Sequence, residues 1–252
     1  MPHNDIKRAI TRARCDAVLF DLDGVITDTA SVHATCWKQL FDEYLQKSAT
    51  LRNEEFRPFD IAHGLPDVRR WQPRCDGVRD FLRSRDISLP EGSPDETPRA
   101  GTVCGLGNRK NELVNKVIEE VGVESYGGSV KLVQQLHLQG FKVAIVTSSQ
   151  NCTAVLKAAK LDGLFPVRVD GNVIHEQQLS GKPAPDTFLL AAKLLGVEPS
   201  RAVVVEDAIS GVQAGRNGEF GLVVGVARKG NEEELRRNGA HIVVNDLGDL
   251  AD

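Results

Sequence analysis

Residues 17–29 read AVLFDLDGVITDT, a short apolar run that ends in two aspartates with one residue between them. The run at 17–20 has the continuous apolar pattern of a strand buried on both faces, and Gly24 allows a tight exit from it. Side chains alternate along an extended chain, so Asp21 and Asp23 project to the same side. The stretch therefore predicts that two carboxylates share one small site at the end of a strand.

This pair of acids suits phosphoryl transfer. One carboxylate can attack phosphorus while the other moves a proton to or from the leaving oxygen. A hard cation such as Mg²⁺ would screen the repulsion between them. The alternative is a buried strand that simply ends in an Asp-rich turn. The rest of the chain has to decide between the two.

Length and composition restrict the class of protein. The chain has 252 residues, of which 41% are hydrophobic and 26% charged, and its net charge is −4. This is enough for one large or two modest domains, and the slight acidity favours a small-molecule partner over nucleic acid or an anionic membrane. Residues 1–14 are basic and polar without a signal-peptide pattern, and no apolar run approaches a membrane span. We expect a cytoplasmic, monomeric protein.

The cysteines are scattered along the chain, odd in number and free of any Cys-x-x-Cys pair. They are Cys15, Cys36, Cys75, Cys104 and Cys152. Such a distribution predicts neither a disulfide framework nor a zinc site. We interpret all of them as ordinary reduced thiols.

The segment that follows the aspartates predicts a smaller helical unit. Apolar spacing predicts a helix over 31–46, with His33 and Trp37 together on another face of it. Taken alone, His33 is best explained as a surface or half-buried helix histidine, and only its closeness to the two aspartates favours a functional role. Over 47–107 apolar runs are short and Arg, Asp, Pro and Gly are frequent. Here we expect a short helix, a proline-containing loop and the start of a long helix, at 71–82, 89–101 and 105–121.

A polar cluster follows the strand expected at 141–146. The next residues, 147–151, read TSSQN. The hydroxyl groups of Thr147 and Ser148, the amide of Asn151 and the free N–H groups of a following helix could cradle a phosphate. A plain helix N-cap cluster is the alternative.

Two more polar clusters occur further along the chain. Residues 180–186 read SGKPAPD, and the prolines stiffen the backbone so that Lys182 can be aimed at phosphate oxygens. A solvated loop lysine is the alternative. The apolar run at 201–205 ends in Glu206 and Asp207, which are typical of metal ligands at a strand end.

All of these clusters lie at or near the carboxyl ends of strands in a repeated strand-helix pattern, which is where open parallel sheets bind ligands. The final strands, expected at 222–226 and 241–244, carry no polar cluster of this kind. Independent structural explanations for every cluster are jointly improbable. The pattern therefore favours a phosphoryl-transfer site over an Asp-rich turn.

The order of these motifs resembles that of the haloacid dehalogenase-like phosphohydrolase superfamily. The motifs are DLDGV, a strand that ends in Thr, GKPAPD and ED. Within this superfamily, the chain is most similar to the beta-phosphoglucomutase group from about residue 15 to its end. The resemblance implies an α/β fold with a doubly wound, Rossmann-like parallel-sheet core and an inserted small helical cap domain. The implied boundaries are an N-terminal extension at 1–14, a catalytic core at 15–28 and 125–252, and a cap at 29–124.

The resemblance also implies roles for the core residues. Asp21 would be the nucleophile that forms an aspartyl-phosphate, and Asp23 the general acid/base. Thr147 and Lys182 would bind the transferring phosphoryl group, with Ser148 and Asn151 in the same substrate-binding region. The implied ligands of Mg²⁺ are Asp21, the backbone carbonyl of Asp23, Glu206 and Asp207.

In the cap, the resemblance implies that Arg74 grips the phosphate that is not being transferred, and that Lys110 contacts sugar or phosphate. Thr29 and His33 would act at the hinge, where His33 helps to orient Asp23. Trp37 would belong to the substrate-binding residues. The chain departs from the family pattern by extra residues around 46–60 and 90–104.

We therefore expect a Mg²⁺-dependent phosphosugar mutase that interconverts beta-D-glucose 1-phosphate and glucose 6-phosphate through an aspartyl-phosphate and a bisphosphate intermediate. Arg74 and Lys110 favour a mutase, because a second phosphate needs a second cationic site. A phosphatase acting on a small sugar phosphate, with water as acceptor, is the alternative. A non-catalytic metabolite-binding homologue would be expected to have lost a core acid or Lys182, and the chain retains them.

Overall fold

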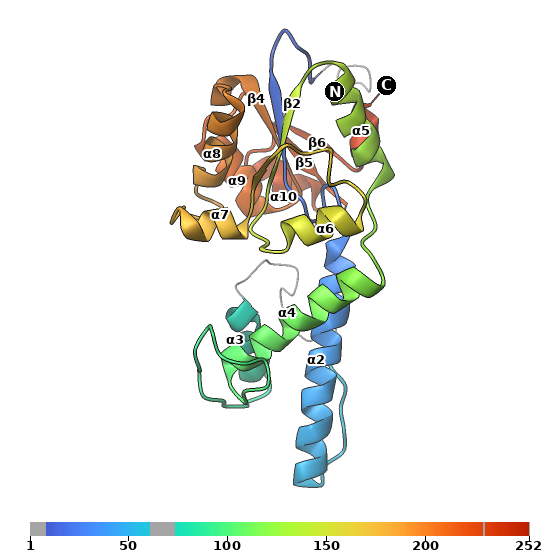
Figure 1. Cartoon of the computed structure of the whole chain (residues 1–252), viewed down its shortest axis with the longest axis vertical. Coiled ribbons are helices and arrows are strands. Elements are labelled where there is room, and N and C mark those ends of the chain that lie inside the picture. Colours follow the sequence, from blue (N-terminus) through green and yellow to red (C-terminus); the bar gives the residue numbers. More distant parts are fainter. Residues whose placement is uncertain (1–8, 61–73, 229, 252) are drawn as a thin grey trace. The chain divides into compact units, whose positions relative to one another are not determined.

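The chain divides into two compact units. The computed structural model describes residues 9–60, 74–228 and 230–251. One unit comprises residues 1–29 and 123–252, and the other comprises residues 30–122. We refer to them as the core unit and the cap unit; most of their elements are labelled in Figure 1.

The core unit is built on a parallel sheet of six strands in the order β3-β2-β1-β4-β5-β6. The strands are β1 (Ala17–Phe20), β2 (Lys142–Val146), β3 (Val167–Val169), β4 (Ala202–Glu206), β5 (Leu222–Val226) and β6 (Ile242–Val244). Strand β1 is central and pairs with β2 and β4, so that Phe20 lies beside Ile145 on one side and Val205 on the other. The loops that follow β1, β2 and β4 are consequently neighbours.

Helices cover the sheet on both faces (Figure 1). They are α5 (Gly127–Leu138), α6 (Cys152–Ala158), α7 (Gly171–Glu176), α8 (Asp186–Leu195), α9 (Ile209–Asn217) and α10 (Glu232–Arg237). Phe188 of α8 and Val212 of α9 share one hydrophobic cluster with Leu19 of β1. Helix α5 packs against β2 on the opposite side. The expectation of a doubly wound parallel sheet is confirmed.

The cap unit is helical and has an aromatic core. Its helices are α2 (Thr29–Arg52), α3 (Arg74–Ser84) and α4 (Val103–Glu120). The ring of Phe41 stacks on Trp37 and Phe81, with centroid distances of 5.0 and 3.6 Å, and Phe59 meets it edge-on. Stacked and edge-on aromatic pairs stabilise a core beyond the area they bury, so this cluster holds α2 and α3 together.

Helix α2 differs from its prediction, because it continues to Arg52 and not to residue 46. Its last turns pack little, and the side chain of Leu51 is 88% exposed. Helical spacing of apolar residues occurs only in the part of a helix that buries one face against the rest of the protein. That is why the sequence predicts a shorter helix.

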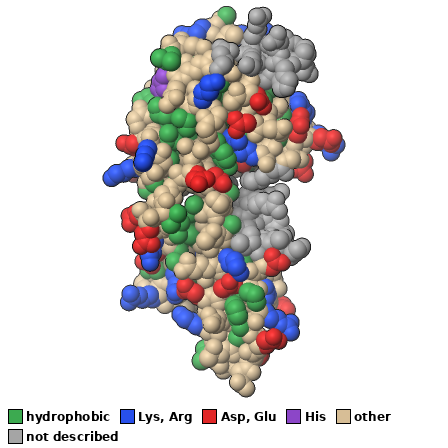
Figure 2. All heavy atoms as spheres, turned by 90° about the vertical axis from the view of Figure 1, so that its right-hand side faces the viewer, with side chains coloured by type: hydrophobic (Ala, Val, Ile, Leu, Met, Phe, Trp, Pro, Cys, Tyr) green, Lys and Arg blue, Asp and Glu red, His purple; other side chains and the backbone are tan. Residues whose placement is uncertain are grey.

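The described helices include none that is both long and apolar enough to cross a membrane. Figure 2 shows acidic and basic side chains interspersed over the face of the described residues that it presents. Such mixing of charges is typical of a solvated surface.

Candidate active site

The two aspartates after β1 are buried and share a hydrogen bond. The side chain of Asp21 accepts from the backbone N–H of Asp23, with 3.0 Å between Asp23 N and Asp21 Oδ2. The turn then passes through Gly24, which has φ of +85°, and a Cβ atom there would lie 2.3 Å from Oδ2 of Asp207. A residue with a side chain would suffer both the backbone strain and this clash. Gly24 therefore allows the β1 loop and the β4 loop to approach each other.

Lys182 joins two of the predicted acids. Its Nζ donates to Asp21 Oδ1 at 2.6 Å, to Glu206 Oε1 at 2.7 Å and to the carbonyl of Val146 at 3.0 Å. Burial opposes the ammonium form, but the charges of Asp21 and Glu206 outweigh it and raise the pKa of Lys182. The lysine is thus a fixed cation inside the site, and the solvated-loop alternative is wrong.

The environment of Asp21 raises its pKa well above the usual range. Burial is the largest cause, Lys182 opposes it, and the negative charges of Glu206, Asp23 and Asp207 add to it. One cation therefore does not balance the carboxylates gathered here. The cluster has the electrostatics of a site that a further positive charge would stabilise.

Asp23 is held by two threonine hydroxyls. Thr29 donates to Oδ1 and Thr147 donates to Oδ2, the latter at 3.2 Å. All three side chains are buried. Each Asp23 oxygen therefore has a fixed donor, and Asp23 is oriented independently of Lys182.

The TSSQN segment after β2 is arranged by its own hydroxyl groups. The N–H of Ser149 donates to Thr147 Oγ1 at 3.1 Å, and the N–H of Asn151 donates to Ser149 Oγ at 3.2 Å. Helix α6 begins at the next residue. Ser148 is exposed and Asn151 is half-buried. The structure thus brings Thr147 into the acid cluster, whereas substrate binding by Ser148 and Asn151 stays a prediction.

Three predicted metal ligands lie close together. Carboxylate oxygens of Asp21, Glu206 and Asp207 all lie within 4.8 Å of one another. Glu206 is fixed on two sides, since its Oε2 accepts from the N–H of Ala208 at 2.9 Å while Oε1 accepts from Lys182. An all-oxygen set of this kind fits a hard cation such as Mg²⁺.

Gly211 is a site residue that the sequence argument missed. A Cβ atom at this position would lie 1.8 Å from Oε1 of Glu206. The helix α9 therefore approaches the Glu206 carboxylate through a position without a side chain. A glycine inside a predicted helix, five residues after an acid at a strand end, is the signal that could have found it.

Three of the predicted cap residues lie together within the cap unit. The Nζ of Lys110 donates to Nδ1 of His33 and lies 5.1 Å from the centre of the Trp37 ring. Burial and the charge of Lys110 lower the pKa of His33 to about 3, so the imidazole is neutral and can accept this bond. Trp37 itself is buried in the aromatic core. The side chain of Arg74 lies outside the described part of the chain.

Polar residues also follow the strands β5 and β6. Arg228 follows β5, and its Nη1 donates to Asp246 Oδ2 after β6 at 2.8 Å. Its Nε donates to the carbonyl of Gly24 at 2.9 Å. The ends of β5 and β6 therefore contribute an ion pair and not an acid cluster like the one after β4. They hold the turn behind Asp23.

Two neighbours of Arg228 contact the same turn. The centre of the Tyr126 ring lies 3.5 Å from the guanidinium carbon of Arg228. The hydroxyl of Ser129 accepts from Arg228 at 3.1 Å and donates to the carbonyl of Val25 at 2.7 Å. Burial and the nearby charge of Asp28 raise the pKa of Tyr126 to about 12. These contacts therefore fix the position of the segment from Gly24 to Asp28.

A model of the haloacid dehalogenase-like hydrolase family matches residues 15–218. A beta-phosphoglucomutase of Mycobacterium bovis is 48% identical over 237 residues, which are 93% of this chain and 90% of that protein. A beta-phosphoglucomutase of Bacillus subtilis is 30% identical over 240 residues, which are 93% of this chain and 91% of that protein.

A solved structure has the same fold. The crystal structure of a beta-phosphoglucomutase from Clostridium difficile superposes with a TM-score of 0.67 at 23% identity, covering 94% of this chain and 93% of that one. At this identity the likeness bears on the fold alone, whereas the family model and the two homologues rest on sequence. The chain belongs to the haloacid dehalogenase-like hydrolase family.

Proposed function

We propose that this protein is a phosphosugar mutase that interconverts beta-D-glucose 1-phosphate and glucose 6-phosphate. The observation that carries the proposal is a second cation in the cap unit, Lys110, which is only 9% exposed. A bisphosphorylated sugar presents two phosphates, and Lys182 in the core unit can serve only one of them. The names of the homologues from Mycobacterium bovis and Bacillus subtilis support the same activity.

Asp21 is the residue we assign as nucleophile. Its Oδ2 accepts from a backbone N–H and its Oδ1 from Lys182, so both oxygens have defined positions. A carboxylate held in this way can attack phosphorus without first being ordered. The bond from phosphorus to the sugar oxygen breaks as the bond to Asp21 forms, which gives an aspartyl-phosphate.

Asp23 is the residue we assign as general acid/base. The hydroxyls of Thr29 and Thr147 fix its carboxylate beside Asp21. From there it would protonate the sugar oxygen that leaves phosphorus and later remove the proton from the hydroxyl that attacks. Two carboxylates with different partners can thus take different parts in one transfer.

Mg²⁺ is the cofactor that the acid cluster fits. Asp21, Glu206, Asp207 and the backbone carbonyl of Asp23 would hold it. Bound there, the ion would keep the carboxylates ionised and withdraw charge from the phosphoryl oxygens. Lys182 would contact the same phosphoryl group from the protein side.

In the cap unit, Lys110 and Arg74 would bind the phosphate that is not being transferred. His33 is neutral and accepts a hydrogen bond from Lys110, so it orients the ammonium without neutralising it. The ring of Trp37 adds a cation–π contact to the same lysine. These contacts fix the orientation of the Lys110 side chain.

The experiment that tests the proposal supplies beta-glucose 1-phosphate, Mg²⁺ and a trace of the 1,6-bisphosphate, and follows glucose 6-phosphate and free phosphate in parallel. We expect glucose 6-phosphate with little free phosphate. Free phosphate as the main product would overturn the mutase and leave a phosphatase with the same core chemistry. No turnover at all, in protein shown to be folded, would overturn both.

A further inference from the structure

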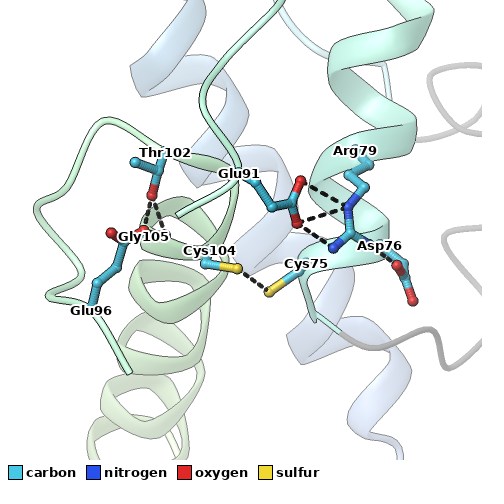
Figure 3. A network of polar contacts seen from close by, with 8 residues as sticks. All are labelled: Cys75, Asp76, Arg79, Glu91, Glu96, Thr102, Cys104 and Gly105. Carbon is cyan, nitrogen blue, oxygen red and sulfur yellow. Dashed lines mark hydrogen bonds and ion pairs between the residues drawn. The ribbon is translucent and has the colours of Figure 1, made fainter. Parts of the chain in front are cut away.

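Two cysteines of the cap unit lie side by side (Figure 3). The sulfur atoms of Cys75 in α3 and Cys104 in α4 are 3.1 Å apart. A disulfide has an S–S distance of about 2.0 Å, so closing the bond needs a movement of roughly 1 Å. Cys75 is half-buried and Cys104 is buried. Cys75 is therefore the more exposed residue of the pair.

Glu91 hydrogen-bonds to both α3 and α4 next to the two cysteines. Its backbone carbonyl accepts from the N–H of Cys104 at 3.0 Å. Its carboxylate accepts from Arg79, one turn after Cys75, with 3.0 Å between Arg79 Nε and Glu91 Oε1. Figure 3 shows both side chains next to the sulfur atoms. The approach of Cys75 to Cys104 is thus supported by polar contacts on either side of it.

Hydrogen bonds and close packing also hold the first turn of α4. Thr102 caps the helix by accepting from the N–H of Gly105 at 3.0 Å, and Glu96 accepts from the same N–H at 3.1 Å. A Cβ atom at Gly105 would lie 2.4 Å from the carbonyl oxygen of Ala100. The loop before α4 therefore packs directly against its first turn, and Cys104 is held in place within that turn.

We propose that Cys75 and Cys104 are a peroxide-sensitive dithiol site that closes to a reversible disulfide. The sulfur of Cys75 attacks one oxygen of the peroxide, the O–O bond breaks, and a sulfenic acid and one water form. The sulfur of Cys104 then attacks the sulfur of Cys75, and a second water leaves with the Cys104 proton. Two thiols lose two electrons, and hydrogen peroxide gains them.

The disulfide would join the first turns of α3 and α4 and close the loop between them. Such a crosslink restricts the unfolded chain and stabilises the folded one. Cys75 directly follows Arg74, the residue that we propose to bind the phosphate that is not being transferred. The crosslink itself requires no assumption about the substrate, so its test is independent of the proposed activity.

In the test, the reduced protein is treated with hydrogen peroxide, quenched with acid and alkylated under denaturing conditions, and its intact mass is measured. We expect two of the five cysteines to resist alkylation, and treatment with dithiothreitol to restore them. Trypsin should release residues 75–79 covalently joined to residues 100–109. Thermal unfolding of the oxidised protein should shift upward by several degrees.

Variants separate this pair from the other thiols. In Cys75→Ser and Cys104→Ser the crosslinked peptide and the thermal shift should both be lost. Cys15→Ser is the matched control, because its hydroxyl can keep the bond that Cys15 donates to the carbonyl of Thr11. It should behave as the wild type. Alkylation of every cysteine after oxidation, a crosslink between other cysteines, or an unchanged melting temperature in the crosslinked protein would overturn the proposal.

Discussion

The two units bury different kinds of side chain. In the core unit, Lys182 contacts two carboxylates in a buried cluster at the ends of adjacent strands. In the cap unit, the buried centre is an aromatic stack around Phe41, and Lys110 lies against the Trp37 ring of that stack. The core unit is thus built to hold opposite charges at fixed distances, and the cap unit to hold one cation in a defined direction. We expect mutations to break chemistry in the first and to alter its outcome in the second.

The largest effect should follow from the change Asp21→Asn. It removes the nucleophile while keeping the size of the side chain, so we expect turnover to fall by at least about 10⁴-fold. The measurement is the rate of glucose 6-phosphate formation, with the mass of the peptide that contains position 21 checked for deamidation. Activity near that of the wild type in undeamidated protein would remove Asp21 from its assigned role.

Next comes Lys182→Met, which leaves Asp21 and Glu206 buried without their shared cation. We expect kcat to fall by about 10³-fold, and the free energy of unfolding without added metal to fall by about 3 kcal/mol. Lys193→Met changes an exposed lysine of α8 and should alter neither quantity. Equal stability of the two variants in denaturant titrations would mean that the Lys182 ion pairs contribute nothing to the folded core.

A smaller effect is expected for Arg228→Lys. The charge is kept, but a lysine cannot donate to Gly24, Asp246 and Ser129 at once. The turn behind Asp23 should loosen, so that kcat falls about tenfold while KM changes little. The matched control is Arg237→Lys on the exposed face of α10. A change confined to KM, or none, would limit Arg228 to a structural role.

A further prediction concerns the pH dependence of stability and not the chemistry. The pKa of His33 falls from 6.5 to about 3 on folding. The unfolded chain therefore binds the proton more tightly, and His33 contributes stability above pH 6.5 that is lost as the pH falls toward 3. His33→Gln should weaken this dependence, as measured by denaturant titration across that window. An unchanged or steeper dependence in the variant would contradict the neutral, buried histidine.

Much of the core unit can be predicted from the sequence, because burial leaves a local signal there. The bounds of β5 coincide with the strand expected at 222–226, and β2 begins one residue later than the strand expected at 141–146. Strand β3 has three residues, two of them only half-buried, and it leaves no apolar run to detect. The acids and Lys182 were found because charged residues at strand ends are unusual enough to suggest chemistry.

The rest depends on contacts between distant residues. Gly211 matters for the space that it leaves beside Glu206, and Arg228 for a carbonyl 204 positions away in the sequence. Cys75 and Cys104 are separated by 29 positions, and no spacing pattern shows that helix packing brings their sulfurs together. Residue types reveal which groups could react, but only the packing of helices and loops decides which of them meet.

The most direct measurement compares Lys110→Met with Lys116→Met. Both lysines lie on α4, but Lys110 is buried against His33 and Trp37, whereas the Lys116 side chain is 66% exposed. The quantity is the ratio of glucose 6-phosphate to free phosphate formed from beta-glucose 1-phosphate with Mg²⁺ and bisphosphate. If the cap cation holds the second phosphate, this ratio should fall at least about tenfold in Lys110→Met and stay at the wild-type value in Lys116→Met. The same ratio in both variants would contradict the division of labour between the two units.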